Sequence, residues 1–244
     1  MSSAILKLPF ILANAVSAQM ALTPPNPPPK ADERSKYEAD KRTKDLLDMV
    51  FWWYMPIVWT FIHVFSAIEA FVILSSTFPF LRHPILDQYL VPKSTSVVLA
   101  HLRITPTFLV GSVILFVSSL LRVICYRTLG KHFTFNLAIR KDHKLITDGP
   151  YAIVRHPSYL AMVIYAIGLT LTQFGEGSWW RESGISSTTL GKILAFFRIV
   201  FPNGLVLLLL NRIPKEDLVL KNEFGKEWEE WVKRTPYGVI PGIY

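Results

Sequence analysis

Five apolar blocks separated by charged connections constrain this chain more than any other feature of its sequence. The blocks run from about Ile5 to Leu22, Met49 to Thr77, Ile104 to Ile124, Ser158 to Phe174 and Ile193 to Leu210. A helix needs about 20 apolar residues to cross a bilayer. Lipid offers no hydrogen-bond partners to the backbone. An apolar segment that crosses the bilayer is therefore expected to be a helix, in which the backbone N–H and C=O groups bond to one another. The sequence predicts an all-α, polytopic helical membrane protein with about five transmembrane helices.

Composition supports this fold class and excludes several functions. Apolar residues make up 51% of the 244 residues, and the net charge of +8 lies in the connections. Orientation in a membrane explains that charge, so no nucleic acid partner is expected. Cys125 is the only cysteine, which excludes an internal disulfide and argues against a cysteine zinc site. We expect it to be an interfacial packing residue. His132, His143 and His156 show no regular ligand spacing, so no metal is predicted.

Lysine and arginine alternate between rich and poor connections along the chain. Six lie in each of 23–48, 126–155 and 211–244, against three in 78–103 and two in 175–192. This alternation predicts five spans with the N-terminus outside and the C-terminus in the cytosol. The first block is therefore interpreted as a retained span. The alternative is a signal peptide cleaved near Val16-Ser17-Ala18.

Several residues within or beside the blocks carry their own predictions. His63 and Glu69 lie inside the second block, where an ionisable residue is a functional candidate. The alternative for Glu69 is a position near the end of the span, in reach of water. Arg198 is expected to extend to the near interface. Pro202-Asn203-Gly204 predicts a kink or an unwound turn. Trp179-Trp180 is expected to form an aromatic belt at the interface.

Two polar stretches are the candidates for chemistry. In the first, Gly149-Pro150 is a turn signal and Pro157 suits the first turn of a helix. Its polar side chains gather at the mouth of the fourth block, where they can hold a polar cofactor: Tyr151, Arg155, His156 and Tyr159. The alternative is a membrane anchor of aromatics and arginine.

The second stretch follows the fifth block. Arg212 and Glu216 are four residues apart and share a face of a continuing helix. Pro214 argues against an unbroken helix between them. A cytosolic amphipathic helix is predicted after them, since apolar residues recur at helical spacing: Leu220, Phe224, Trp228 and Trp231. If the last two blocks form a hairpin, both stretches build one pocket; otherwise Arg212 and Glu216 form a helix-end salt bridge of little value.

These stretches together resemble the isoprenylcysteine carboxyl methyltransferases and related membrane methyltransferases. The resemblance covers roughly Lys131 to Tyr244, and the Pro-rich linker after a first span looks like fungal-type members. The matching residues are His143-Lys144-Leu145-Ile146, Gly149-x-Tyr151, Arg155-His156-Pro157-Ser158-Tyr159, Arg212-x-x-x-Glu216-Asp217 and Phe224-Gly225-Lys226-Glu227-Trp228. The apolar blocks and the charge alternation divide the chain into a first transmembrane helix (1–22), a cytosolic linker (23–48), the second and third helices (49–125) and a region with the fourth and fifth (126–244). The resemblance implies that this last region is methyltransferase-like and catalytic.

The resemblance implies methyl transfer from S-adenosylmethionine to the carboxylate of a prenylated C-terminal cysteine of proteins or peptides. It implies an endoplasmic reticulum membrane protein in contact with lipids, with its active site facing the cytosol. Arg212 would bind and orient the substrate carboxylate as the catalytic residue. The cofactor-binding residues would be His143, Lys144, Leu145, Ile146, Tyr151, His156, Pro157, Ser158, Tyr159 and Glu216.

Three other functions stay open. A phospholipid N-methyltransferase would need a base, because an amine must lose a proton. An NADPH-dependent membrane sterol reductase shares a similar C-terminal motif. A non-catalytic membrane adaptor would not need Tyr151, His156, Arg212 or Glu216. The sequence holds no Walker loop or G-x-G-x-x-G motif, so a soluble nucleotide-binding fold is not expected.

Overall fold

The computed structural model describes residues 3–29, 46–93, 98, 101–136, 138 and 142–243. Every regular element within these ranges is helical. Five helices are long and apolar enough to cross a membrane, namely Ala4–Leu22, Trp53–Thr77, Pro106–His132, Pro157–Phe174 and Thr189–Phe224. The chain is thus a multi-pass membrane protein, as the apolar blocks predict. The cytosolic linker predicted over 23–48 falls largely on residues 30–45, which lie outside the described residues.

The long helices follow the predicted blocks closely, and short helices fill several connections. In chain order the elements are η1 (Ser3–Lys7), α1 (Leu8–Leu22), α3 (Leu46–Thr77), η2 (Pro79–Leu81), α4 (Pro84–Leu90), α6 (Pro106–Leu129), η3 (Gly130–His132), η4 (Gly149–Ala152), α7 (Pro157–Phe174), α8 (Trp179–Glu182), η5 (Ile185–Ser187), α9 (Thr189–Phe224) and α10 (Lys226–Arg234).

Helix α9 corrects the break predicted at Pro214 and the unwound turn predicted as one alternative at Pro202. The other alternative there, a kink, stays a prediction. Helix α9 continues without an unwound turn at Pro202 and without a break at Pro214. A proline removes one helical hydrogen bond, whereas an unwound turn in lipid would leave several backbone groups unpaired. The helix ends instead at Gly225, whose φ of 52° favours glycine. The predicted amphipathic C-terminal helix is therefore divided, and α10 is a separate element.

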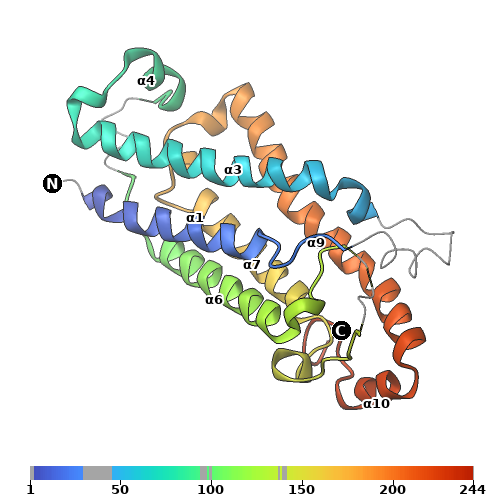
Figure 1. Cartoon of the computed structure of the whole chain (residues 1–244). Coiled ribbons are helices and arrows are strands. Elements are labelled where there is room, and N and C mark those ends of the chain that lie inside the picture. The colour runs from blue at the N-terminus through green and yellow to red at the C-terminus, as the bar shows by residue number, and fades with distance from the viewer. Residues whose placement is uncertain are drawn as a thin grey trace. The chain divides into compact units, whose positions relative to one another are not determined.

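The chain forms two compact units, each described here by itself. Unit 1 contains Met1–Met20, Ile57–Val117 and Ile164–Asn203, and unit 2 contains Ala21–Pro56, Ser118–Val163 and Gly204–Tyr244. In unit 1, α1 lies between α3 and α6 (Figure 1). Its Asn14 amide donates to the Ser112 hydroxyl of α6 at 2.9 Å, and Gln19 bonds His63 of α3 at 2.8 Å.

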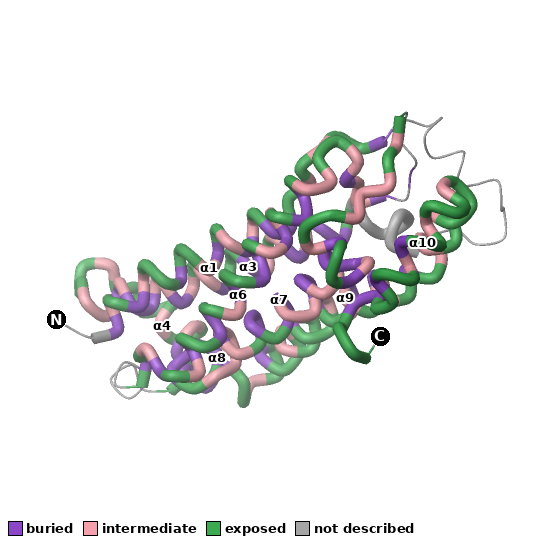
Figure 2. Tube along the Cα trace, turned by 90° about the horizontal axis from the view of Figure 1, so that it is seen from below, coloured by how far each residue is buried: buried purple, intermediate pink, exposed green. Residues whose placement is uncertain are grey.

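The two sides of α1 have different environments. Ile11, Ala15 and Ala18 are buried in the unit, whereas Leu12 and Val16 are exposed although apolar. Figure 2 shows buried and exposed residues alternating along this helix. An exposed apolar stripe on a long helix is suited to lipid rather than water.

The core of unit 1 contains two residues that we expected at an interface. Trp179 and Trp180 are buried and pack against Phe65, with ring centroids 6.1 and 5.3 Å from it. The Trp179 indole donates to the carbonyl of Leu90 at 2.8 Å. The predicted aromatic belt is therefore wrong at this position. Two tryptophans in a connection can also be buried in the core when the buried indole N–H finds an acceptor, as Trp179 does at the Leu90 carbonyl.

A buried ion pair fastens the start of the chain in unit 1. The Lys7 ammonium donates to the Glu69 carboxylate at 2.5 Å and to the Gly177 carbonyl at 2.7 Å. Lys7 is fully buried and Glu69 is 9% exposed. The alternative in which Glu69 reaches water is thus wrong, because its partner is a lysine 62 residues earlier.

Unit 2 holds the second part of α6, the start of α7, the end of α9 and α10. Cys125, Tyr151 and Trp231 are buried together in one core cluster. The Cys125 thiol is free. It packs beneath the connection after α6 and beneath α10, so its expected packing role is confirmed, and its place at a membrane interface stays a prediction.

Replacing Glu69 by leucine should destabilise the protein by about 3 to 5 kcal/mol, because Lys7 would remain buried without its counter-charge. The double variant Lys7→Met/Glu69→Leu should recover most of that loss. Thermal unfolding in a neutral detergent measures both effects. Glu176→Gln is the matched control, since the Arg103–Glu176 pair is exposed and should contribute little. Wild-type stability in the single Glu69→Leu variant would contradict the assigned role of the pair.

Candidate functional site

A cavity of about 100 Å³ lies within unit 2 and collects both polar stretches. Of the eleven site residues that the sequence predicts, ten line this cavity. These ten are His143, Lys144, Leu145, Ile146, Tyr151, His156, Ser158, Tyr159, Arg212 and Glu216. Pro157 is the exception: it is buried as the first residue of α7 and so shapes the turn.

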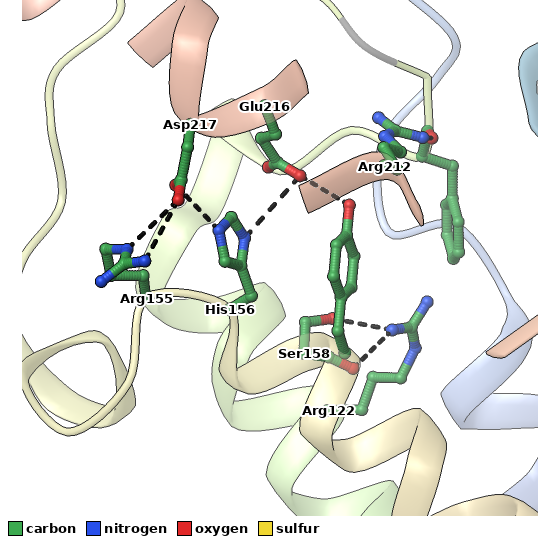
Figure 3. Close-up of polar contacts among 9 residues, drawn as sticks. Arg122, Arg155, His156, Ser158, Arg212, Glu216 and Asp217 are labelled. Atoms are coloured by element: carbon green, nitrogen blue, oxygen red, sulfur yellow. Dashed lines mark hydrogen bonds and ion pairs between the residues drawn. The ribbon is translucent and has the colours of Figure 1, made fainter. Parts of the chain in front are cut away.

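Asp217 joins the two stretches. Its carboxylate accepts hydrogen bonds from Arg155 Nε at 3.3 Å, Arg155 Nη2 at 3.2 Å and His156 Nε2 at 3.0 Å (Figure 3). An ionised carboxylate can only accept, so the proton of this contact is on His156 Nε2. Hydrogen bonds between charged partners are about twice as strong as neutral ones. The start of α7 and the end of α9 are therefore fixed to each other at this carboxylate.

Glu216 makes the neighbouring contacts on the cavity side. The Tyr159 hydroxyl donates to Glu216 Oε2 at 2.6 Å, and His156 Nδ1 lies 3.8 Å from the same oxygen (Figure 3). The rings of His156 and Tyr159 are stacked, with centroids 5.4 Å apart. A carboxylate, an imidazole and a phenol thus hold one another in a fixed arrangement at the cavity wall.

The segment after α10 completes the turn that contains Arg155 and His156. The backbone N–H groups of these two residues donate to the carbonyls of Tyr237 and Gly238 at 2.9 and 2.7 Å. Arg155 Nη1 also donates to the carbonyls of Thr235 and Pro236. Arg155 lines the cavity, and its guanidinium also holds three segments together.

Arg122 of α6 supports the same turn from the opposite side. This buried guanidinium donates through Nη1 to the Ser158 hydroxyl at 2.7 Å and to the Ser158 carbonyl at 3.1 Å (Figure 3). Its Nε donates to the carbonyl of Ala21 at 2.6 Å. Because Ser158 Oγ accepts from Arg122, its own hydroxyl proton can be donated elsewhere, and Ser158 lines the cavity.

Arg212 and Tyr151 supply further donors to the cavity. Arg212 is 3% exposed, and its Nη1 donates to the carbonyl of Phe135 at 2.6 Å. Burial, reinforced by the charge of Glu216, raises the pKa of the Tyr151 phenol well above its ordinary value. Its hydroxyl therefore keeps its proton at physiological pH. The indole of Trp231 fixes the same turn by donating to the Tyr151 carbonyl at 3.1 Å.

The loop before this turn forms another wall. Leu145 and Ile146 present apolar side chains to the cavity, beside Leu220 of α9 and Trp231 of α10. The ring of His143 lies 4.7 Å from that of His132 and 5.7 Å from that of Phe224. Within the described residues, no group of three or more His, Cys, Asp or Glu side chains is placed to hold a metal ion.

Sequence reasoning missed the residues that hold the site together. The sequence predicts a cofactor contact for Arg155 rather than a structural role, and it assigns no role to Asp217 or Arg122. The available signal for Asp217 is that it places a second carboxylate directly after Glu216. An Arg-His pair in the other polar stretch, Arg155-His156, offers the matching donors. The residues from Thr235 onward act through their backbone carbonyls, which every residue type has, so their role could not be predicted from the sequence.

Comparisons with known proteins find a likeness to a methyltransferase family over part of the chain. Residues 108–176 match the model of the Isoprenylcysteine carboxyl methyltransferase (ICMT) family. The chain is 30% identical over 131 residues to protein-S-isoprenylcysteine O-methyltransferase B of Arabidopsis thaliana, covering 53% of this chain and 57% of that protein. It is 34% identical over 113 residues to protein-S-isoprenylcysteine O-methyltransferase of Schizosaccharomyces pombe, covering 45% and 39%.

A different class of enzyme is also similar to part of the chain. Delta(14)-sterol reductase TM7SF2 of Mus musculus is 28% identical over 101 residues, which cover 41% of this chain and 20% of that protein. The chain spans about half the length of the curated plant relatives it matches. Together the comparisons show that part of this chain is similar to the ICMT family.

Replacing Asp217 by asparagine should destabilise unit 2 by about 1.5 to 3 kcal/mol, the usual value of hydrogen bonds to a charged group. The loss should be local, with faster hydrogen exchange at Arg155, His156 and the 235–238 segment. Hydrogen exchange with mass spectrometry measures this. Lys221→Gln, which removes the exposed pair with Glu229, is the control and should leave exchange there unchanged. Unaltered exchange in Asp217→Asn would show that Asp217 does not join these segments.

Proposed function

We propose that this chain, as a relative of the isoprenylcysteine carboxyl methyltransferases, methylates the carboxylate of a prenylated C-terminal cysteine with S-adenosylmethionine. One observation carries the proposal. The motif residues between His143 and Tyr159 and those between Arg212 and Glu216 line a single cavity. The first of these stretches lies within the residues that match the family model.

The cavity residues suit the groups of the proposed cofactor, which would supply an electrophilic methyl group when bound. S-adenosylmethionine carries cationic, carboxylate and hydroxyl groups beside an adenine ring. Glu216 offers a carboxylate for hydroxyl or amino donors, and the Ser158 and Tyr151 hydroxyls offer donors for acceptors. Leu145 and Ile146 contribute apolar residues to the lining.

Arg212 is the residue that we assign to the substrate. A guanidinium carries five N–H donors in a planar fork that matches a carboxylate, and it keeps its charge at any physiological pH. One donor is held by the Phe135 carbonyl, which fixes the orientation of the group at the cavity wall. The substrate carboxylate would be bound through other donors of the same guanidinium.

The chemistry requires alignment rather than proton removal. An α-carboxyl has a pKa of about 3.5, so the substrate is already an anionic nucleophile at neutral pH. The residues must place its oxygen in line with the methyl group and exclude water. The Arg155, His156 and Asp217 contacts serve rigidity, and Leu220 and Trp231 cover the cavity with apolar surface.

The proposal includes a location. A site at the cytosolic edge of the endoplasmic reticulum membrane would receive a polar cofactor from water and an apolar prenyl chain sideways from lipid. The positive connections of the chain support this orientation. The linker resemblance to fungal-type members remains part of the same proposal.

A sterol reductase is the second candidate, because a Delta(14)-sterol reductase shares part of this sequence. The family match and the methyltransferase relatives favour methyl transfer. No comparable observation favours phospholipid N-methylation or a non-catalytic adaptor.

Microsomes containing the chain should transfer labelled methyl groups from S-adenosylmethionine to a farnesylated cysteine analogue, giving a base-labile ester. The expected ester forms because the substrate carboxylate is ionised at neutral pH. An analogue with an amidated carboxyl group is the control and should remain unlabelled. Label found in phospholipid would instead identify an N-methyltransferase. Absence of label together with NADPH-dependent sterol reduction would identify a reductase.

Arg212→Ala and Glu216→Gln should affect different steps. Arg212→Ala should lower kcat/KM for the prenylcysteine by about 100-fold, as expected for loss of charged hydrogen bonds, while cofactor affinity changes little. Glu216→Gln should mainly weaken cofactor affinity. Substrate kinetics and cofactor titration measure the two effects separately. Arg234→Ala, at an exposed arginine of the same unit, is the control. Equal loss of both affinities in Arg212→Ala would refute its role.

A further inference from the structure

Arg198 of α9 is the one described arginine of unit 1 that is buried, with an exposed fraction of 4%. We expected it to extend to an interface, and that prediction is wrong. Its guanidinium lies over the Phe65 ring at 5.2 Å from the centroid. Its Nη2 is buried and has no hydrogen-bond partner among the described residues. A buried charge without a partner is strongly unfavourable, so we expect a partner from beyond the described residues.

Arg198 lines a cavity within unit 1, of about 40 Å³. Most of the wall is apolar or aromatic, with Phe65, Phe108, Phe174, Trp179 and Trp180 among the lining residues. The cavity shares no residue with the candidate methyltransferase site. It is therefore a separate place to bind a ligand.

The charges around this cavity do not balance. Glu69 is the carboxylate of the lining, and its oxygen accepts from the Lys7 ammonium at 2.5 Å. Lys7 thus neutralises Glu69, and the positive charge of Arg198 is left over. Asn14, another polar lining residue, uses its amide to bond Ser112. The lining consequently presents one net positive charge in apolar surroundings.

Water alone does not compensate such a charge. A cavity of this size has room for about three water molecules. Water can satisfy the hydrogen bonds of Nη2, but it brings no negative charge. In apolar surroundings the dielectric constant is low, so the attraction between Arg198 and a negative charge is stronger than in water. An oxyanion meets both requirements, because a guanidinium donates in parallel to two oxygens of a carboxylate or phosphate.

We propose that this cavity binds the oxyanion head of a membrane amphiphile, a carboxylate or a phosphate ester carried on a hydrocarbon chain. The head would be bound by Arg198, and the aromatic lining would contact the first part of the chain. A free inorganic anion would lose its whole hydration shell in this setting, whereas an amphiphile also gains apolar contacts. The protein has five helices that are long and apolar enough to cross a membrane, and membranes contain such amphiphiles.

The test uses the purified full chain in a neutral detergent. Oleate should raise its unfolding midpoint and bind at least about tenfold more tightly than oleyl alcohol, which has the same hydrocarbon chain without the charge. Lysophosphatidic acid should behave like oleate, and inorganic phosphate alone should have no effect. Thermal unfolding gives the stabilisation, and native mass spectrometry gives the bound mass and the affinity.

Variants assign the effect to Arg198. Arg198→Gln should abolish the preference for oleate, and Arg198→Lys should keep part of it. The Gln variant should fold, since it removes an uncompensated charge, and circular dichroism checks this. Arg103→Gln, at an exposed arginine of the same unit, should bind as the wild type does.

Three results would overturn the proposal. They are equal binding of oleate and oleyl alcohol, an unchanged preference in Arg198→Gln, and stabilisation by inorganic phosphate equal to that by oleate. None of these measurements uses methyl transfer, so the outcome is independent of the proposed function.

Discussion

The hydrogen bonds that Asp217 accepts from Arg155 and His156 are the constraint on which the candidate site depends. They join two segments about 60 residues apart in the chain, at distances of 3.0 to 3.3 Å. With these segments joined, Glu216 faces Tyr159 and both stretches border one cavity. The proposed methyl transfer to a carboxylate would require rigid alignment above all. These hydrogen bonds hold the cavity residues in position and need not move a proton.

The structure deals with its buried cations in different ways. Lys7 has a carboxylate and a carbonyl, and Arg122 has two carbonyls, a hydroxyl and aromatic faces. The partly buried Arg155 has a carboxylate and two carbonyls. Each solution supplies acceptors that replace water. Arg198 lies over the face of Phe65, and its Nη2 has no hydrogen-bond partner among the described residues. This contrast, rather than burial alone, distinguishes Arg198 as a binding residue for something outside the chain.

Sequence patterns predicted what depends on local composition. The five spans follow from runs of apolar residues, and the meeting of the two stretches follows from a hairpin of the last two blocks. The sequence patterns gave wrong predictions where the partner of a residue lies far away in the sequence. Glu69 was interpreted without Lys7, and Trp179 was interpreted without the Leu90 carbonyl. Pro202 and Pro214 argued for interruptions, but the requirement for paired backbone in lipid outweighed the local preference of proline.

The carbonyls of Thr235 to Gly238 that receive Arg155 and His156 have a consequence for biosynthesis. They lie some 80 residues beyond the turn that they complete, so the ribosome makes them long after that turn has left it. The nascent chain can insert its helices in order and still lack a finished turn. Competence for the reaction would then arise only once translation has passed Gly238, which keeps partly synthesised chains inert in the membrane.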